Sequence, residues 1–243
     1  MDVADDVRSR IIARLATTSP TDGQRSSLCR VCVDITATTG AGIMLMASDI
    51  PAGWVCATDE VSVLIEELQF ALGEGPCVDA FQLNRPVVEP NLSNPAESRW
   101  TAFRGPVLAA GVRAIFGFPM RVGAVRIGAL NMYCDRPGAL SNEQHGEALA
   151  MAEIAASVIV MSQADGPGDG LVAELEGGGD SRLVVHQATG MVAVQLKMSV
   201  ASALIRLRAF AFADGHAIVD VAEAVVARRL RFDQSDRGAV WTA

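Results

Sequence analysis

Residues 181–232 read SRLVVHQATGMVAVQLKMSVASALIRLRAFAFADGHAIVDVAEAVVARRLRF, and the C-terminal quarter of the chain is organised around this stretch. Apolar residues recur in it at three- and four-residue spacing, in three blocks separated at Ser199 and at Asp214–Gly215. That spacing is typical of amphipathic helices. Ser199 suits the N-cap of the second helix, Asp214 the start of the third, and Gly215 a left-handed helix end. The stretch therefore predicts an all-α three-helix bundle over residues 181–233.

The same residues carry a family pattern. It comprises Ser181-Arg182, Val185, Gln187-Ala188, Gly190, Ala203-Leu204, Leu207-Arg208, Ala211, Ile218, Asp220-Val221-Ala222 and Val225-Val226. This pattern resembles the ANTAR domain, an RNA-binding output module of bacterial signalling proteins. The resemblance implies that the bundle binds two paired hairpins in an mRNA leader, as a homodimer. Binding of this kind prevents premature transcription termination.

By this resemblance, the first helix contributes an RNA surface made of Arg182, His186, Gln187 and Thr189. Three of these residues, Arg182, His186 and Thr189, follow three- and four-residue spacing and can share one helical face. Thr189 departs from the family, which often has Lys at this position. The alternative interpretation is an ordinary solvated helix face.

Three arginines later in the bundle are further candidates for RNA contact. Arg208 falls at the edge of the apolar stripe of the second helix. It either forms an ion pair, with Asp220 or Glu223 as the candidate partners, or donates to a phosphate or a base. Arg228 and Arg229 give the third helix a basic end, which favours either the helix dipole or a phosphate contact.

Charge is distributed unevenly along the chain. The formal net charge is −8. Residues 180–233 hold seven Lys and Arg against five Asp and Glu, a balance of +2, which leaves −10 for residues 1–179. The mildly basic back is therefore the expected place for a contact with a polyanion. Because the excess is small, RNA binding would depend on shape and a few placed residues.

The front of the chain predicts a second domain of the α+β class. Strand patterns occupy residues 41–46, 53–58, 86–89, 112–120 and 125–134, and helical patterns occupy residues 24–38, 61–72, 95–110 and 141–163. Ser141 and Gln144 form a capping box at the start of the last helix. Helices that flank a largely antiparallel sheet define the α+β class.

This front region resembles a GAF domain, a sensory fold. The resemblance lies in Leu68-Gln69, Leu72-Gly73-Glu74-Gly75-Pro76-Cys77, Asp79-Ala80, Pro86-Val87-Val88, Ala114, Gly117-Phe118-Pro119 and Ile127-Gly128-Ala129-Leu130-Asn131. It implies a sensor domain that can take a small-molecule ligand. The run Gly73–Cys77 is typical of GAF domains that precede ANTAR domains in actinobacterial proteins.

The expected organisation has five parts. These are an N-terminal segment (1–23), the GAF-like sensor (24–163), a Gly-rich linker (164–180), the ANTAR-like bundle (181–233) and a tail (234–243). The glycines of the linker favour a flexible tether over a rigid helical connection.

The cysteines receive mainly structural interpretations. The number of cysteines is odd, at five, and argues against a disulfide framework. The pair Cys29-x-x-Cys32 lies in a helical pattern and lacks further ligands for zinc, so we interpret it as two core thiols. Cys77 is a candidate redox or ligand residue because a nearby helix N-terminus would favour its thiolate, whereas the alternative is a buried small side chain.

Several classes of protein are disfavoured by the sequence. No signal peptide or apolar run of membrane-spanning length is evident, so a cytoplasmic protein with no membrane contact is expected. Nucleotide-binding and hydrolase motifs are missing, and no haem pocket is evident around His145. We therefore expect no enzyme activity, no catalytic residues, no metal and no cofactor.

These observations favour a signal-responsive RNA-binding regulator of transcription antitermination. The first alternative is a small-molecule or redox sensor whose bundle binds a protein partner. A cysteine-based enzyme acting on methionine sulfoxide and a DNA-binding helix-turn-helix protein are further alternatives. The sequence does not identify the ligand of the sensor or the target transcripts.

Overall fold

The computed structural model describes residues 3–17, 24–47, 50–94, 99–164, 179–233 and 239–241. The chain divides into two compact units, Met1–Gly168 and Asp169–Ala243, which are described separately below. Most of the expected Gly-rich linker, residues 165–178, lies outside the described residues, as do residues 234–238 and 242–243 of the expected tail.

The first unit is a five-stranded sheet flanked by helices. In chain order it contains α1 (Val3–Thr17), α2 (Gln24–Thr36), β1 (Gly40–Ala47), β2 (Ile50–Ala57), α3 (Glu60–Leu72), α4 (Pro76–Leu83), β3 (Val87–Glu89), α5 (Thr101–Ala109), β4 (Ala114–Val122), β5 (Val125–Cys134) and α6 (Asn142–Ala164). The strand order is β2-β1-β5-β4-β3, with each neighbouring pair antiparallel. The predicted α+β class is confirmed for this unit.

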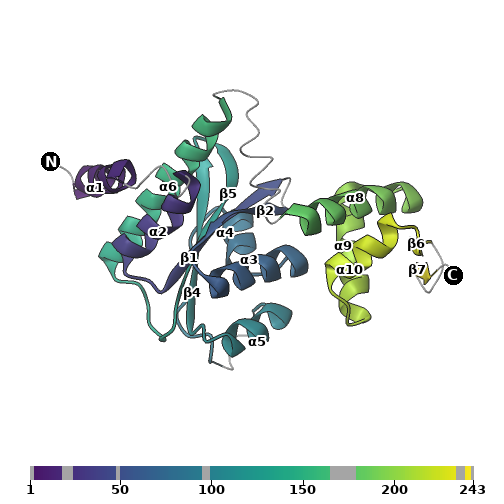
Figure 1. Cartoon of the computed structure of the whole chain (residues 1–243). Coiled ribbons are helices and arrows are strands. Elements are labelled where there is room, and N and C mark those ends of the chain that lie inside the picture. The colour runs from purple at the N-terminus through teal and green to yellow at the C-terminus, as the bar shows by residue number, and fades with distance from the viewer. Residues whose placement is uncertain are drawn as a thin grey trace. The chain divides into compact units, whose positions relative to one another are not determined.

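One face of the sheet packs against α2 and α6, and α1 packs on these two helices (Figure 1). Strand side chains alternate between the two faces. On β4, Phe116, Phe118 and Met120 therefore join the core beneath α2 and α6, and Leu130 of β5 joins them there. The helix α6 begins with the predicted capping box, in which Ser141 and Gln144 exchange hydrogen bonds of 2.9 and 3.1 Å.

The opposite face packs against α3 and α4, and α5 contacts α3. Gly42, Gly117 and Asn131 belong to this side of the sheet. Asn131 of β5 pairs with Gly42 of β1 on one side and with Gly117 of β4 on the other. The sheet is therefore apolar under α2 and α6 and carries small and polar residues under α3 and α4.

The N-terminal helix α1 is amphipathic only weakly, yet it packs on α2 and α6. Ile11 has no exposed surface and belongs to the same core as Phe116 and Phe118. The residues predicted as an N-terminal segment thus include a helix that covers part of the sheet unit.

The interpretation of Cys29 as a core thiol is wrong. Cys29 of α2 forms a disulfide with Cys56 of β2, and their Cα atoms are 6.1 Å apart. The odd number of cysteines led to this error, because one disulfide leaves Cys32, Cys77 and Cys134 as thiols. Cys32 is buried in the core, as expected.

The second unit contains three helices and a short hairpin among its described residues. These are α8 (Gly179–Leu196), α9 (Val200–Ala213), α10 (Ile218–Val226), β6 (Leu230–Phe232) and β7 (Ala239–Trp241). The helices pack on one another, and α8 and α10 also contact β6. The backbone N–H of Phe232 donates to Gln195 Oε1 at 2.8 Å, which fixes the hairpin to α8.

The helix ends of this unit agree with the sequence in two places and differ in one. Ser199 caps α9 by accepting from the Ser202 N–H at 3.1 Å, and Gly215 has φ +66°, as predicted. Asp214 does not begin the third helix. It ends α9, and α10 starts after Ala217, which lacks a capping side chain.

Within the described residues, length and composition alone make α6 long and apolar enough to cross a membrane. Its residues Ala148, Met151, Ala152 and Ala155 are buried against the sheet. A core helix passes the same test of length and composition, so the apolar character of α6 is explained by this packing.

Candidate functional site

The turn Gly73–Cys77 organises three helices over one face of the sheet. Gly73 ends α3 in the left-handed conformation, at φ +69°, where glycine is favoured. Glu74 Oε1 accepts hydrogen bonds from the N–H groups of Ala102 and Phe103, at 2.7 and 2.9 Å. A carboxylate at the start of a helix satisfies amides that have no partner within the helix. The turn thus ends α3, begins α4 and caps α5.

Gln69 supplies the cap that Gly75 lacks. Gly75 precedes α4 with φ +134° and has no side chain to cap the helix. Gln69, one turn before the end of α3, accepts from the Cys77 N–H at 2.7 Å through Oε1. A β-carbon at Gly75 would lie 2.7 Å from this side chain, so the close approach requires glycine.

A buried polar cluster lies between α3 and the sheet. It consists of Glu66, Gln69 and Asn131, each with no exposed surface. Glu66 and Gln69 are one turn apart on α3, and Asn131 Nδ2 of β5 donates to Glu66 Oε1. Uncharged amides and a carboxylate in such a place are costly unless they are satisfied, so this cluster is a candidate ligand site.

The two glycines beside Asn131 make room for the cluster. Gly42 pairs with Asn131 on one side and Gly117 on the other. A β-carbon at Gly42 would clash with the Glu66 carboxylate, and one at Gly117 with the backbone of Pro76. These glycines let Glu66 and the first turn of α4 lie directly against the sheet. Larger residues at positions 42 and 117 would push them away from it.

A donor and an acceptor of the cluster lack hydrogen-bond partners among the described residues. These are Gln69 Nε2, a donor, and Asn131 Oδ1, an acceptor. Buried groups of this kind are normally satisfied by protein or by an ordered small molecule such as water. A small polar ligand with both donor and acceptor groups would complement them.

Cys77 does not have the properties expected of a thiolate. It is fully buried, and its sulfur lies 3.8 Å from the Ala129 carbonyl oxygen. Burial raises the pKa of the Cys77 thiol well above its usual value, and the nearby Glu66 charge adds to this, against the opposing hydrogen bond from Gln69. Burial therefore outweighs the helix N-terminus, which favours the alternative interpretation of Cys77 as a buried small side chain.

The structure exposes two of the four residues predicted on the first helix of the bundle. His186 and Gln187 of α8 are both exposed. Thr189 is 1% exposed and donates to the Val185 carbonyl oxygen at 2.6 Å, so its predicted contact with RNA is incompatible with this position. Arg182 lies in α8, but its side chain is outside the described part of the structure.

The later arginines occupy different elements. Arg208 of α9 is partly buried, whereas Arg206 is exposed, in agreement with the helical spacing. Desolvation lowers the pKa of Arg208 to about 10, so it remains charged at neutral pH. Arg228 and Arg229 are exposed in the turn that follows α10, and α10 packs against α8.

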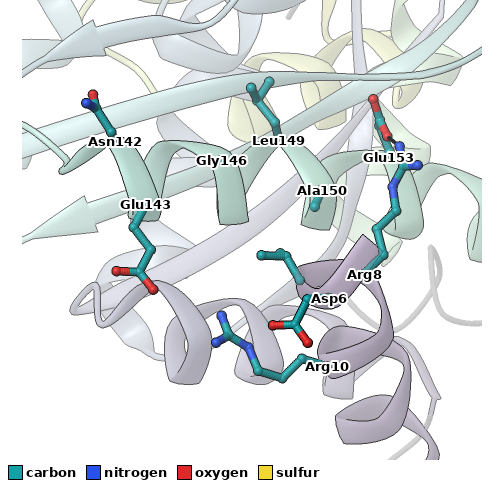
Figure 2. Close-up of a pocket in the computed structure, with 10 residues that line it drawn as sticks. Asp6, Arg8, Arg10, Asn142, Glu143, Gly146, Leu149, Ala150 and Glu153 are labelled. Atoms are coloured by element: carbon teal, nitrogen blue, oxygen red, sulfur yellow. Dashed lines mark hydrogen bonds and ion pairs between the residues drawn. The ribbon is translucent and has the colours of Figure 1, made fainter. Parts of the chain in front are cut away.

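A groove of about 650 Å³ lies between α1 and α6 (Figure 2). Its floor includes Gly146 and Leu149, and charges of both signs line its walls. Arg8 pairs with Glu153 across it, with both side chains half exposed. Exposed ion pairs of this type contribute little to stability. We therefore interpret the groove as the place where α1 packs against α6.

Sequence reasoning missed the polar cluster and the groove. Ser62, Glu66 and Gln69 are buried polar residues at four- and three-residue spacing on α3, which was the available signal for the cluster. In the described part of the chain, no three His, Cys, Asp or Glu side chains converge in a way that would hold a metal ion.

Comparison with known proteins agrees with this architecture. Residues 26–160 match the GAF domain family. The GAF domain of a phosphoenolpyruvate-protein phosphotransferase from Acinetobacter has a TM-score of 0.50 and 14% identity, over 68% of this chain and 98% of that one. The equivalent domain from Coxiella burnetii has a TM-score of 0.50 and 10% identity, over 67% and 95% of the two chains.

These two likenesses show a shared fold, because their sequence identities are low. No curated protein is significantly similar to the chain in sequence. The family match covers more than half of the 243 residues, including the sheet, α3, α4 and the polar cluster. The chain belongs to the GAF domain family.

Proposed function

We propose that the chain is a signal-responsive RNA-binding regulator. The first unit, called the GAF unit below, receives a signal. The second unit, called the helical unit below, binds paired hairpins in nascent mRNA and promotes transcription antitermination. GAF domains are sensor domains of signalling proteins, which supports the first half of the proposal. The resemblance of residues 181–226 to ANTAR domains supports the second half.

One observation carries the RNA-binding half, namely how the family pattern divides between core and surface. Its apolar positions are buried in the helical unit, including Val185, Ala188, Leu204, Leu207, Val221 and Val225. Its polar Gln187 is exposed beside His186. Exposed amides and imidazoles can bond or stack on bases splayed out of hairpin loops.

Electrostatics would supply a second, weaker contribution. Exposed cations of the helical unit include Lys197, Arg206, Arg228, Arg229 and Arg231. Each can contact a phosphate and release counterions, which makes binding depend on salt. Because Asp220 and Glu223 are exposed on the same unit, shape and base contacts must provide the selectivity.

The test is a titration of the full chain with a labelled two-hairpin RNA, with duplex DNA of equal length as competitor. We expect selective RNA binding, weakened about tenfold or more by a His186→Ala/Gln187→Ala double variant, since stacking contributes about 1–3 kcal/mol per base. Val194→Ala, which truncates an exposed apolar side chain of α8 outside the pattern, is the matched control and should lose less than threefold. Equal competition by duplex DNA would refute the proposal.

We propose that the ligand of the GAF unit is a small polar molecule held by Gln69 and Asn131. The buried donor Gln69 Nε2 and acceptor Asn131 Oδ1 support this site. An Asn131→Leu variant should lose ligand-induced thermal stabilisation in a metabolite screen. Leucine also removes the donor to the buried Glu66 carboxylate, so circular dichroism and a thermal melt must first establish that the variant folds.

The second candidate function is binding of a protein partner by the helical unit. Exposed apolar side chains favour it, among them Val194 at 79%, Ile205 at 65% and Phe212 at 69% exposure. In that case Ile205→Ala and Phe212→Ala would abolish partner binding, and RNA would not be retained. We also propose that the protein is not an enzyme, since burial keeps the candidate nucleophile Cys77 protonated.

A further inference from the structure

The cysteines of α2 and β2 have no role in the function proposed above. Cys29 and Cys56 are joined by a disulfide between elements 27 residues apart in sequence. Their exposed fractions are 0% and 4%. The bond links a helix to β2, which is the edge strand of the sheet. A covalent link at a sheet edge constrains a part of the fold that would otherwise open easily.

The pairing of β2 is irregular next to this disulfide. Cys56 lies opposite Ile43 of β1, and the register shifts immediately afterwards, between Ile43 and Met44. A second shift follows between Leu45 and Met46. Irregular pairs leave backbone groups without ladder bonds and weaken local cooperativity. The disulfide therefore holds the edge strand where its hydrogen-bonded pairing is least regular.

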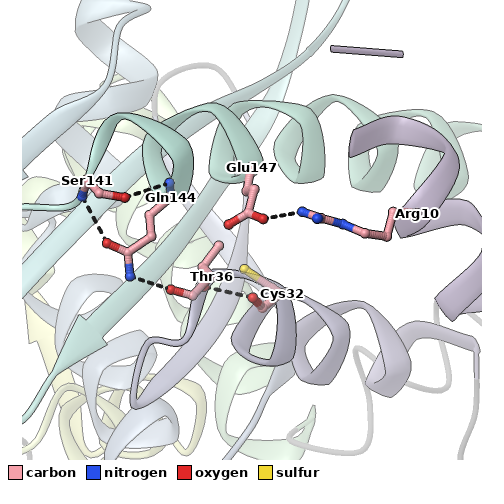
Figure 3. Close-up of polar contacts among 6 residues, drawn as sticks. All are labelled: Arg10, Cys32, Thr36, Ser141, Gln144 and Glu147. Carbon is pink, nitrogen blue, oxygen red and sulfur yellow. Dashed lines mark hydrogen bonds and ion pairs between the residues drawn. The ribbon is translucent and has the colours of Figure 1, made fainter. Parts of the chain in front are cut away.

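The helix at the other end of the disulfide contacts α6 through polar groups (Figure 3). Thr36 of α2 accepts from Gln144 Nε2 at 2.7 Å through its backbone oxygen. Cys32, one turn after Cys29, is buried close enough to Glu147 of α6 for that carboxylate to affect its titration. Glu147 in turn pairs with Arg10 of α1. The position of α2 is thus coupled to α1 and α6.

We propose that Cys29 and Cys56 form a thiol redox site that makes the GAF unit responsive to the thiol–disulfide balance of its surroundings. In the oxidised state, the disulfide holds β2 against α2. In the reduced state, no covalent bond joins β2 to α2, so β2 is held only by its irregular ladder and by non-covalent packing on α2 and α3. The helix α2 can then change its packing against α6. This inference deepens the proposed function, because it names a signal, and it rests on that function only for the transfer of the signal from the GAF unit to RNA binding.

The reaction balances with a dithiol as the reductant. A thiolate of the dithiol attacks Cys56 Sγ on the edge strand, the Cys29–Cys56 bond breaks, and Cys29 leaves as a thiolate that takes up a proton. The second thiol of the reductant, as its thiolate, then displaces Cys56, which is protonated in turn. The protein gains two electrons and two protons, and the dithiol becomes a cyclic disulfide. Local opening of β2 must precede the attack, because both sulfurs are buried.

The proposal is tested on the full chain in two redox states. Protein oxidised with glutathione disulfide and protein reduced with dithiothreitol are alkylated, and the cysteine pairs are mapped by mass spectrometry. We expect a Cys29–Cys56 pair in the oxidised sample. Reduction should lower the thermal midpoint by on the order of 10 °C, from the loss of a closed loop of this length. It should also speed amide exchange at least tenfold in residues 50–57, 24–36 and 142–150.

Variants separate the disulfide from a general effect of reductant. A Cys29→Ser/Cys56→Ser double variant should match the reduced wild type and no longer respond to dithiothreitol. Cys134→Ser, which removes a half-buried thiol outside the pair, should respond as the wild type does. If the double variant does not fold, the reversible reduction of the wild type still decides the question.

Three outcomes would overturn the inference. One is a Cys29–Cys32 pair in the oxidised protein, which would leave β2 unattached to α2. Another is a reduced protein whose exchange changes in residues 50–57 alone, which would disconnect the site from α6. The third is no disulfide under either condition. None of these measurements uses RNA, so their failure is distinct from failure of the RNA-binding proposal.

Discussion

At the scale of single residues, the sheet face beneath α3 depends on glycines that leave no room for a β-carbon. Gly42 is the clearest case, because a methyl group there would lie less than 3.0 Å from both Glu66 Oε1 and Asn131 Nδ2. We predict that Gly42→Ala lowers the free energy of unfolding by about 1–3 kcal/mol, through displacement of the buried cluster. Urea denaturation followed by circular dichroism measures this change.

Gly146→Ala provides the matched control for Gly42→Ala. Gly146 lies in the interior of α6, and no atom lies within 4 Å of a β-carbon placed on it. The same substitution should therefore stabilise the protein by about 0.5–1 kcal/mol, since alanine has the higher helix propensity. Equal effects of the two substitutions would contradict the packing described around Glu66.

Glu147 predicts a specific dependence of stability on pH. Burial raises the pKa of Glu147 above its usual value, and the attraction of Arg10 offsets this only in part. The folded protein therefore holds this proton more tightly than the unfolded chain does. The stability of the protein therefore falls as pH rises from the pKa of Glu147 in the unfolded chain to its pKa in the folded protein. Above both pKa values, the loss of stability is constant.

Glu147→Gln should remove this contribution. Relative to wild type, the variant should gain stability as pH rises above about 4, the ordinary pKa of a glutamate, because glutamine has no proton to lose. Thermal melts at several pH values measure the difference. Glu153→Gln, which breaks the exposed pair with Arg8, is the control for loss of a surface ion pair. If the difference in thermal stability between Glu147→Gln and wild type does not vary with pH, the pKa of Glu147 is not raised on folding.

The sequence contained a signal for the polar cluster but not for the disulfide. Ser62, Glu66 and Gln69 share one face of α3, so a helical projection could have identified them as a polar stripe. By contrast, spacing on α2 suggests a relation between Cys29 and Cys32. Cys56 became the partner of Cys29 because the register of β2 places it under α2, and that register is a tertiary property.

At the scale of elements, α5 begins on a carboxylate supplied by another segment. Glu74 accepts hydrogen bonds from Ala102 and Phe103 at the first turn of α5. We predict that Glu74→Ala costs about 1–2 kcal/mol of stability, as the loss of a helix cap does. Hydrogen exchange should quicken in residues 101–109. Glu67→Ala, at an exposed position of α3, should leave that exchange unchanged.

The hairpin of the helical unit predicts a second element-scale effect. Phe232 of β6 is 1% exposed, and its ring lies 5.3 Å from that of Phe210 of α9. We predict that Phe232→Ala lowers the stability of this unit by about 3–5 kcal/mol, the usual range for a buried phenylalanine. The matched control is Phe212→Ala, which truncates a side chain that is 69% exposed. Comparable losses in the two variants would mean that β6 is not part of the core.

Most elements followed from their local pattern, but the helix α4 and the strands β6 and β7 were not predicted. The strands β4 and β5 and the helices α3 and α6 have strong periodicity and local caps, so the sequence predicted them well. The strands β6 and β7 are three residues each. A strand that short carries almost no periodic signal and is stabilised by contacts with α8 and α10. Asp214 was misplaced because the connection is longer than expected: α9 ends at Ala213, and α10 begins only at Ile218.

At the scale of the whole molecule, the two units divide the expected roles of sensing and binding. Residues 1–179 carry a net charge of −10, whereas residues 180–233, which form most of the helical unit, carry +2. Long-range repulsion of RNA by the acidic unit would favour contacts confined to the helical unit. With few cations there, high affinity requires two helical units to act on one RNA.

This requirement gives the last prediction, which concerns a homodimer on a two-hairpin RNA. If each helical unit binds one hairpin, joining two hairpins should raise the affinity by about 10²–10⁴-fold over a single hairpin. The salt dependence should also double, because twice as many phosphates are contacted. Titrations of one-hairpin and two-hairpin RNAs at several salt concentrations measure both quantities. Scrambling one hairpin loop at constant length is the control, since it keeps the phosphates and removes the bases. Equal affinities for one and two hairpins would show that a single helical unit binds alone, and would remove the reason for a dimer.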